Sequence, residues 1–498
     1  MAFQLSDKHF KTYPHFDQII SSDELHAIVD SPERVASNAF FPFIQYAKSY
    51  QPFRDGKVKV EKKERLIRYA SRRDSAIFAR YRADLSTRYE ARLSALGIAD
   101  VPIAYRKIPD TSGSGGGKCN IDFAHDLFRA IQTHDACVVI ALDIRKYFES
   151  IDHRRLYTVW CSLLETDSLP RDHLALFKAI TSYRYVDRTA AYERLGFIAP
   201  VRQKDGSVRA DYTVPFKQMP KQLCSPKDFR EKIAGKGGAY SSLIQRNNNP
   251  YGIPQGAPLS DLLANAYLMD FDVELARYAR ERGGQYWRYS DDLALVLPGD
   301  GSVGKEAEKW VTNRIHDYGD AMQIKAAKTS IGTFTRTGSG VHHYQYVAGD
   351  GGRDGIQYLG FRFDGRQAYL RNSTLSNLYR KITKRARRQA RNHFARYQGH
   401  NKESLMQKFD FHGFEQRFGR VRDFENVADS KGWTFWTYAR RASERFGDLG
   451  QPILAQVSGY RGYVRRSVSE ELDRLFSYRA AHKNPFITRS PEKGCDSN

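Results

Sequence analysis

Two apolar segments, one followed by an aspartate and the other interrupted by two, constrain the fold of this chain more than any other feature of its sequence. Ala136 to Leu142 is a short β-branched run, typical of a buried strand, and Asp143 follows it directly. Tyr286 to Leu297 fits two strands joined by a tight turn at Ser290-Asp291-Asp292. The two segments therefore predict a β-sheet that holds three carboxylates at strand ends.

Most of the remaining pattern is helical. A Gly/Ser loop at Thr111–Gly117 interrupts the first part of the chain, the polar stretch at about 189–250 predicts an irregular insertion, and Tyr358–Phe363 predicts a short strand. Apolar residues at helical spacing predict helices at four places: Lys62–Ala95, His153–Glu165, Asp261–Arg282 and Lys305–Tyr318.

The charge of the chain favours a polyanionic partner. Lys and Arg number 79 against 57 Asp and Glu, which gives +22, and phosphate neutralisation with counterion release suits such a surplus. A soluble protein that is merely basic is the alternative. The chain from residue 366 onward carries 27 basic and 13 acidic residues, a net +14.

An amphipathic helix with a basic outer face is expected in this C-terminal region, with Leu375, Ile382 and Phe394 on its apolar stripe. No acid lies between Arg380 and Arg396, so repulsion among the cations is uncompensated unless something anionic sits there. Nucleic acid is the expected anion, and a solvated face is the alternative. The candidate contact residues are Arg380, Lys384, Arg385, Arg387, Arg388 and Arg391.

Cysteine usage and the termini favour a cytoplasmic protein. The five cysteines are scattered without a C-x-x-C pair, which favours a reducing compartment over a disulfide framework or a zinc site. The N-terminus lacks the features of a signal peptide, and no apolar run approaches the roughly 18 residues that span a bilayer. We therefore expect a soluble protein without membrane contact.

The carboxylates and one loop point to phosphoryl transfer. Mg²⁺ prefers hard oxygen ligands, and two Mg²⁺ ions about 3.5–4 Å apart can activate a 3′-hydroxyl and stabilise departing pyrophosphate. The loop Gly252-Ile-Pro-Gln-Gly-Ala-Pro-Leu-Ser260 lies between the two carboxylate segments in sequence. Each piece alone is ambiguous, since an Asp-Asp pair is usually a turn or a helix cap. Their joint occurrence in this order predicts a metal-dependent nucleotidyl transfer site.

The same three segments resemble the palm motifs of reverse transcriptases. The matching patterns are Asp143-x-x-x-x-Phe148, Gly252-x-Pro-Gln-Gly-x-x-x-Ser260 and Tyr289-x-Asp-Asp292, while Ile324–Thr329 and Tyr358–Phe361 are similar to two later motifs. The resemblance covers roughly residues 60–365. Within the family, the chain looks most like bacterial defence-associated enzymes of the unknown-group and abortive-infection types. The segments that carry this narrower likeness are Ala104–Lys107, Lys118–Ala124 and Phe148–His153.

The resemblance implies an α+β fold of the right-hand polymerase type. Residues 1–135 would be helical fingers. Residues 136–365 would be an antiparallel-sheet palm, with the irregular insertion at about 189–250. Residues 366–498 would be a basic helical thumb or C-terminal domain.

The resemblance also implies roles for individual residues. Asp143, Asp291 and Asp292 would bind two Mg²⁺ ions, with Mn²⁺ as a substitute, and the Ile144 backbone would lie near a metal or a phosphate. Phe148 would act as a steric gate that excludes a 2′-hydroxyl. Without the motif, Phe148 would be interpreted as an ordinary core residue and Lys328 as an ordinary surface lysine. The nucleotide-binding candidates are Phe148, Gln255, Lys328, Arg106 and Lys118. The primer and template candidates are Tyr289, Tyr358, Gly360 and the basic helix residues.

The implied function is RNA-directed DNA synthesis from dNTPs, copying a dedicated structured non-coding RNA in bacterial anti-phage defence. The resemblance also allows a homo-oligomer, with the C-terminal region as an interface rather than a thumb. An RNA-dependent RNA polymerase is one alternative, although those enzymes usually carry a second acid where this chain has Phe148. A nucleic-acid-binding scaffold derived from a polymerase is another, although it would not need adjacent buried carboxylates.

Overall fold

The computed structural model describes residues 5–50, 63–110, 116–202, 207–349, 352–418 and 434–481. Most of the expected Gly/Ser loop, at 111–115, therefore lies outside the described residues. The chain divides into two compact units. The first contains Met1–Cys119 and Asp126–Ile356, and the second contains Asn120–His125 and Gln357–Asn498. The three-domain division remains a prediction.

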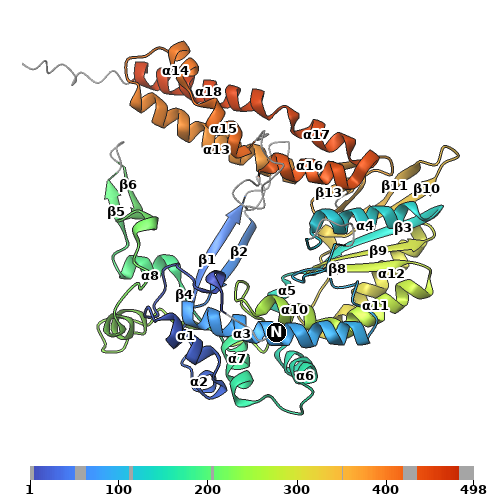
Figure 1. Ribbon diagram of the computed structural model, residues 1–498, viewed down its shortest axis with the longest axis horizontal. Helices are drawn as coiled ribbons and strands as arrows, with labels where there is room; N and C mark the ends of the chain where they lie inside the picture. The colour runs from blue at the N-terminus through green and yellow to red at the C-terminus, as the bar shows by residue number, and fades with distance from the viewer. Residues whose placement is uncertain are drawn as a thin grey trace, which may run out of the picture. The chain divides into compact units, whose positions relative to one another are not determined.

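The first unit is built on an antiparallel five-stranded sheet with strand order β11-β10-β3-β9-β8 (Figure 1). Helices α11 (Met269–Glu281) and α12 (Gly301–Arg314) pack against its strands. The strand and hairpin expected from the sequence are confirmed, with β3 one residue longer so that it includes Asp143. The strands are β3 (Ala136–Asp143), β8 (Gln285–Tyr289), β9 (Asp292–Pro298), β10 (Ser330–Arg336) and β11 (His342–Gly349).

A second, four-stranded sheet of this unit has the order β2-β1-β4-β7, in which only β1 and β4 run parallel. Its strands are β1 (Phe43–Tyr50), β2 (Lys63–Tyr69), β4 (Arg184–Asp187) and β7 (Gln245–Arg246). The first unit also contains the helices α1 (Ser22–Val29), α2 (Pro32–Ala36), α3 (Arg72–Ala95), α6 (His153–Leu164) and α7 (Arg171–Thr181). The mixture of antiparallel sheets and many helices agrees with the expected α+β class.

The helix expected from Lys62 to Ala95 is wrong at its N-terminal end. Residues 63–69 are strand β2, which pairs with β1, and the helix begins only after Ser71, whose hydroxyl accepts the Asp74 N–H at 3.1 Å. Leu66 and Ile67 thus lie on opposite faces of a strand. The periodicity could not reveal this, because the strand is formed through a long-range partner.

The expected irregular insertion at 189–250 is partly wrong, because it contains regular elements. Two of them, β5 and β6, form an antiparallel hairpin, and Tyr192, Met219 and Ile233 contribute to a buried apolar cluster. The elements in this region are α8 (Arg188–Arg194), β5 (Ile198–Arg202), β6 (Val208–Tyr212), a 3₁₀ turn (Phe216–Gln218), α9 (Pro226–Asp228), a π-helical turn (Phe229–Ile233) and β7.

Two other expected elements are interrupted. The helix expected over 261–282 is divided at Leu268 (ψ 15°) into α10 (Ser260–Tyr267) and α11. The strand expected over 358–363 is divided by a turn at Leu359 and Gly360 into β12 (Ile356–Tyr358) and β13 (Phe361–Phe363). By contrast, the expected helices at 153–165 and 305–318 are confirmed as α6 and as α12 with the 3₁₀ turn Ile315–Tyr318.

The second unit combines a small three-stranded sheet with helices. Its elements are β12, β13, β14 (Ala368–Leu370), α13 (Asn372–Arg396), α14 (Lys402–Lys408), α15 (Phe411–Phe418), α16 (Phe435–Phe446), α17 (Gln451–Ser458) and α18 (Tyr460–Ala481). Helix α4 (Asn120–Gln132) belongs to it only through its first residues, Asn120–His125. No helix in the described ranges combines the length and the apolar character that crossing a bilayer requires.

The expected basic amphipathic helix is confirmed as α13, but part of its charge is compensated. Leu378, Ile382 and Ala386 are buried on its inner face. The buried carboxylate of Glu471, on α18, accepts from Arg391 Nε at 2.6 Å and lies 3.7 Å from Arg387 Nε. Burial alone would raise the pKa of Glu471, but Arg391 and Arg474 outweigh it and lower that pKa. An acidic residue from a distant part of the chain therefore supplies some of the negative charge that compensates the cations of α13.

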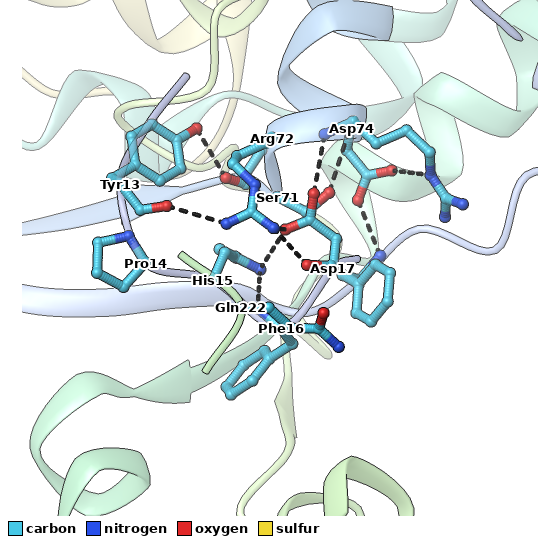
Figure 2. A network of polar contacts seen from close by, with 12 residues as sticks. Tyr13, Pro14, His15, Phe16, Asp17, Ser71, Arg72, Asp74 and Gln222 are labelled. Atoms are coloured by element: carbon cyan, nitrogen blue, oxygen red, sulfur yellow. Dashed lines mark hydrogen bonds and ion pairs between the residues drawn. The ribbon is translucent and has the colours of Figure 1, made fainter. Parts of the chain in front are cut away.

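A buried polar network fastens the N-terminal segment to the start of α3 (Figure 2). The Arg72 guanidinium donates to the carbonyl oxygens of Tyr13, Lys221 and Asp17, and it pairs with the Asp17 carboxylate at 3.3 Å. His15 is fully buried and accepts the Phe16 N–H on Nδ1 at 2.8 Å. Burial, together with the Arg72 charge, lowers the pKa of His15 to about 3.

His15 should therefore make the fold less stable in mild acid. Below pH 6.5, the ordinary value for histidine, the unfolded chain takes up a proton that the folded chain excludes until the pH nears 3. The neutral form of His15 contributes fully to the free energy of unfolding above pH 6.5. Between pH 6.5 and about 3 that free energy falls by about 1.4 kcal/mol per pH unit. Urea unfolding at several pH values should show a steeper loss for the wild type than for His15→Asn. Parallel curves would contradict the prediction.

Candidate active site

Asp143, Asp291 and Asp292 lie where β3 ends and β9 begins. Asp143 and Asp292 are directly opposite one another in the β3–β9 pair, so their side chains lie on the same face of the sheet. Asp143 is buried, with 5% of its surface exposed, and Asp291 and Asp292 are half-buried. Like charges directly opposite each other are destabilising in a sheet. The fold therefore holds together groups that repel each other.

The hairpin turn that carries Asp291 is strained. Strands β8 and β9 pair from Tyr289↔Asp292 onward, which leaves the two-residue turn Ser290-Asp291. Ser290 is buried at φ 60°, a left-handed conformation that favours glycine. The Ile144 N–H donates to the Asp291 carbonyl at 2.8 Å and ties the turn to the residue after β3. Strain of this kind persists where surrounding structure enforces it, often at functional sites.

A buried ion pair contacts the backbone of this turn. Arg288 and Asp272 are both fully buried, and the guanidinium donates to the carboxylate at 2.7 and 2.5 Å. Arg288 also donates to the carbonyl of Ser290 at 3.3 Å and to that of Asn265 at 3.0 Å. Tyr286 donates a further hydrogen bond to Asp272 at 3.0 Å. This cluster fixes the backbone from which Asp291 projects.

The charge of Asp143 acts on Asp291. Burial raises the pKa of the Asp291 carboxyl, and the neighbouring Asp143 charge raises it further. Lys328 and Arg65 oppose the shift. The two carboxylates are thus an unfavourable pair for which a cation is the natural complement.

Lys328 is brought to Asp143 by the backbone. The Arg145 N–H donates to the Gln323 carbonyl at 2.8 Å, and the Lys325 N–H donates to the Asp143 carbonyl at 2.7 Å. These bonds hold the 3₁₀ turn Ala326–Lys328 beside the end of β3. The Lys328 ammonium forms an ion pair with the Asp143 carboxylate and remains 40% exposed.

The donor chemistry fits a divalent cation only in part. Carboxylates are the hard ligands that Mg²⁺ prefers, and the repulsion between Asp143 and Asp291 is what a cation would relieve. Within the described ranges, however, no three His, Cys, Asp or Glu side chains are grouped so that they could hold a metal ion. Lys328 supplies the positive charge at Asp143 in this arrangement. Metal binding would require the Lys328 ammonium to move away from Asp143 and the carboxylates to come closer together.

Two of the nucleotide-binding candidates lie on neighbouring segments. Phe148 is on α5 (Tyr147–Ser150), where its half-buried ring packs against the main core, and its carbonyl accepts the Ile253 N–H at 2.8 Å. The carbonyl of half-buried Gln255 accepts the Arg68 N–H at 2.9 Å. Gly256 has φ 116°, and a Cβ there would lie 2.8 Å from the Arg68 carbonyl, so this turn of the loop requires glycine.

Arg106 and Lys118 are engaged in other interactions. The Arg106 guanidinium donates to both Glu90 carboxylate oxygens, at 2.8 and 2.5 Å, and to the carbonyls of Ala99 and Pro102. Its side chain is only 5% exposed. Lys118 pairs with Asp126 at 2.7 Å. The placement of Arg106 gives no support to the predicted triphosphate contact.

The primer and template candidates are divided between the two units. Tyr289 is in the first unit, half-buried beside Tyr105, with ring centroids 6.4 Å apart. Tyr358 and Gly360 are in the second unit, where Tyr358 is 4% exposed and so offers little ring surface to a ligand. The α13 candidates are in the second unit too; Arg385 is half-buried there, and the others are exposed: Arg380, Lys384, Arg387, Arg388 and Arg391.

Sequence reasoning missed Arg65 and the Arg288–Asp272 pair. Arg65 is exposed on β2 and acts electrostatically on Asp291 from a distant part of the chain. Arg288 lies only two residues before the turn, but an arginine in a strand is normally expected to reach solvent. No local signal distinguishes it from a surface residue.

Comparisons with known proteins give structural similarity only. No protein-family model matches the sequence, and no curated protein matches it. Among solved structures, a C-terminally truncated apo telomerase from Candida tropicalis is similar at TM-score 0.36 and 12% identity, over 65% of this chain and 55% of that one. A Candida albicans telomerase bound to a fragment of telomeric RNA is similar at TM-score 0.36 and 10% identity, over 93% of this chain and 67% of that one. The chain thus spans about half of the truncated enzyme. Similarity at this level assigns neither a fold nor a function.

Proposed function

We propose that this protein is a template-directed nucleotidyltransferase, and specifically an RNA-directed DNA polymerase that joins dNTPs. The observation that supports the proposal is that Asp143 is opposite Asp292 at the β3–β9 strand ends and that its charge also acts on Asp291. Such a reaction requires little covalent chemistry from the protein, because positioning and neutralisation of charge supply most of the catalysis.

Asp143, Asp291 and Asp292 would hold two Mg²⁺ ions, with the Ile144 backbone beside them. When bound, the metals would activate the attacking hydroxyl and neutralise charge on the leaving pyrophosphate. Lys328 is 40% exposed, so its ammonium can leave Asp143 and neutralise a phosphate instead. Phe148 and Gln255 would position the sugar and the base of the nucleotide. Arg288 would keep the Asp291 turn rigid without touching substrate.

The finer assignment rests on the sequence resemblance alone. A dedicated non-coding RNA as template and a role in bacterial anti-phage defence belong to the family that the motifs resemble. Self-association is proposed on the same basis, and a cytoplasmic location is proposed from the scattered cysteines. Sequencing of the RNA and DNA that co-purify with the protein would identify the template and product directly.

The proposal predicts that Phe148 selects against ribonucleotides. Wild type should incorporate dNTPs in preference to NTPs, and Phe148→Ala should reduce the ratio of the two kcat/KM values at least about tenfold, since the ring no longer fills the space of a 2′-hydroxyl. The measurement is single-nucleotide incorporation with each substrate class on a primed RNA template.

A matched control is Phe177→Ala. Phe177 is also half-buried against the main core, on α7, so its truncation should have a similar packing cost without changing selectivity. Preference of the wild type for NTPs would indicate an RNA polymerase and overturn the assignment.

A further inference from the structure

A cavity in the described part of the first unit lies beside the carboxylate site but does not include it. It has a volume of about 630 Å³ and is bounded by strands of the four-stranded sheet, by α5 and by the segment around Gly252. Pockets of 300–1,000 Å³ suit small ligands. None of the three carboxylates lines it, nor do Gln255 and Lys328.

The lining of this cavity is cationic. Among the described lining residues four are basic, Arg68, Arg145, Lys146 and Arg246, and one, Glu149, is acidic. Arg145, Lys146 and Arg246 are exposed, so their charged groups are free to reorient toward a ligand. Cations from three separate segments around one cavity favour an anionic ligand.

Arg68 provides an independent indication of a ligand. It is 6% exposed, and its Nη1 has no hydrogen-bond partner among the residues that the structure describes. Its Nε donates to Gln45 at 2.8 Å, which fixes the guanidinium, but no described carboxylate forms an ion pair with it. A buried charge is costly unless it is paired, so an anion in the cavity would satisfy this group.

The walls also offer surfaces suited to a base. The Arg68 guanidinium lies over the rings of buried Tyr183 and half-buried Tyr185, 5.0 and 5.2 Å from their centroids, and of the two rings Tyr185 is the more accessible to a ligand. Asn247 is held by its own hydrogen bonds to Thr181 and Tyr251, whereas Asn248 and Asn249 are exposed and line the cavity. Aromatic faces bind bases by stacking, and amides hydrogen-bond to base edges.

The backbone at Lys146 supports this assignment. Lys146 has φ 48°, a left-handed conformation that is uncommon for a lysine, and its carbonyl accepts the Glu149 N–H at 2.8 Å. Such conformations occur preferentially at ligand-binding sites. The strained residue is one of the four cations that line the cavity.

We propose that this cavity binds a nucleotide through its phosphate, as a site separate from the carboxylate centre. The ligand is either a free nucleotide or one nucleotide of a single strand, since both present the same phosphate and base. The site requires no metal, because arginine and lysine supply the positive charge.

The test is equilibrium binding in EDTA, followed by fluorescence anisotropy. One probe is a fluorescent deoxynucleoside triphosphate, and the other is a short labelled oligothymidylate. The variants are Arg246→Gln and the double variant Arg246→Gln with Lys146→Gln. The matched control is Arg277→Gln, an exposed arginine on α11 that does not line the cavity.

The double variant should raise Kd at least about tenfold relative to the control, because charge-assisted hydrogen bonds to phosphate are lost. An effect on the triphosphate probe alone identifies a free nucleotide, and an effect on the oligonucleotide identifies a strand. If neither probe distinguishes the double variant from Arg277→Gln, the inference is overturned. Incorporation assays are independent of this result, so a failure of the polymerase proposal would be recognised separately.

Discussion

Asp291→Asn should abolish metal-dependent nucleotide incorporation, with a loss of at least about a hundredfold in kcat. The amide removes the charge that would bind a metal but keeps the size of the side chain. Because the substitution also relieves the repulsion with Asp143, the folded state should become more stable, not less. Incorporation kinetics and urea unfolding on the same preparation would measure both effects.

A matched control for this variant is Asp270→Asn on α11, an exposed carboxylate that pairs with Arg155 away from the turn. It should change neither incorporation nor stability by much, since surface pairs contribute about 0–1 kcal/mol. Full activity of Asp291→Asn in cells would favour the scaffold alternative instead.

Arg288→Met should destabilise the first unit by about 3–5 kcal/mol, because it leaves the Asp272 carboxylate buried without its partner. The same variant frees the Ser290 carbonyl, so surviving folded protein should also lose activity. Urea unfolding midpoints would measure the first effect, and incorporation below the unfolding transition would measure the second.

Two further variants separate the charge from the packing. Arg314→Gln, on α12, removes surface ion pairs with Asp317 and with Glu274, which is on α11 as Asp272 is, and each pair should contribute about 1 kcal/mol or less. The double variant Arg288→Met with Asp272→Leu should recover part of the lost stability, since apolar replacements of a buried pair are often tolerated. Equal losses in Arg288→Met and Arg314→Gln would refute the proposed role of the buried pair.

The parts of the fold that the sequence predicted correctly are those with strong local patterns. The apolar run before Asp143 and the hairpin around Asp291 appear as β3, β8 and β9, and the basic stripe appears as α13. In each case neighbouring residues carry the signal, through β-branched runs or through apolar residues at helical spacing. The closeness of Asp143 and Asp292 then follows from strand pairing.

The errors arise where long-range contacts decide. The local apolar spacing predicts a helix at residues 63–69, but these residues form strand β2. They do so because they pair with β1, residues 43–50, and no local pattern encodes that pairing. The pairing of Arg106 with Glu90, 16 residues earlier, is likewise not encoded by neighbouring residues. Glu471 likewise pairs with α13 residues about 80 positions earlier. The partners of charged residues in particular are determined by the fold and not by neighbouring residues.

The most direct measurement of the central claim is the position of Mn²⁺ in crystals grown with a non-reactive deoxynucleotide, located by anomalous scattering. We expect two ions about 3.5–4 Å apart, bound by Asp143 together with Asp291 or Asp292, with Lys328 displaced from Asp143. Mn²⁺ bound elsewhere, with the Lys328 ammonium still paired to Asp143, would contradict the account.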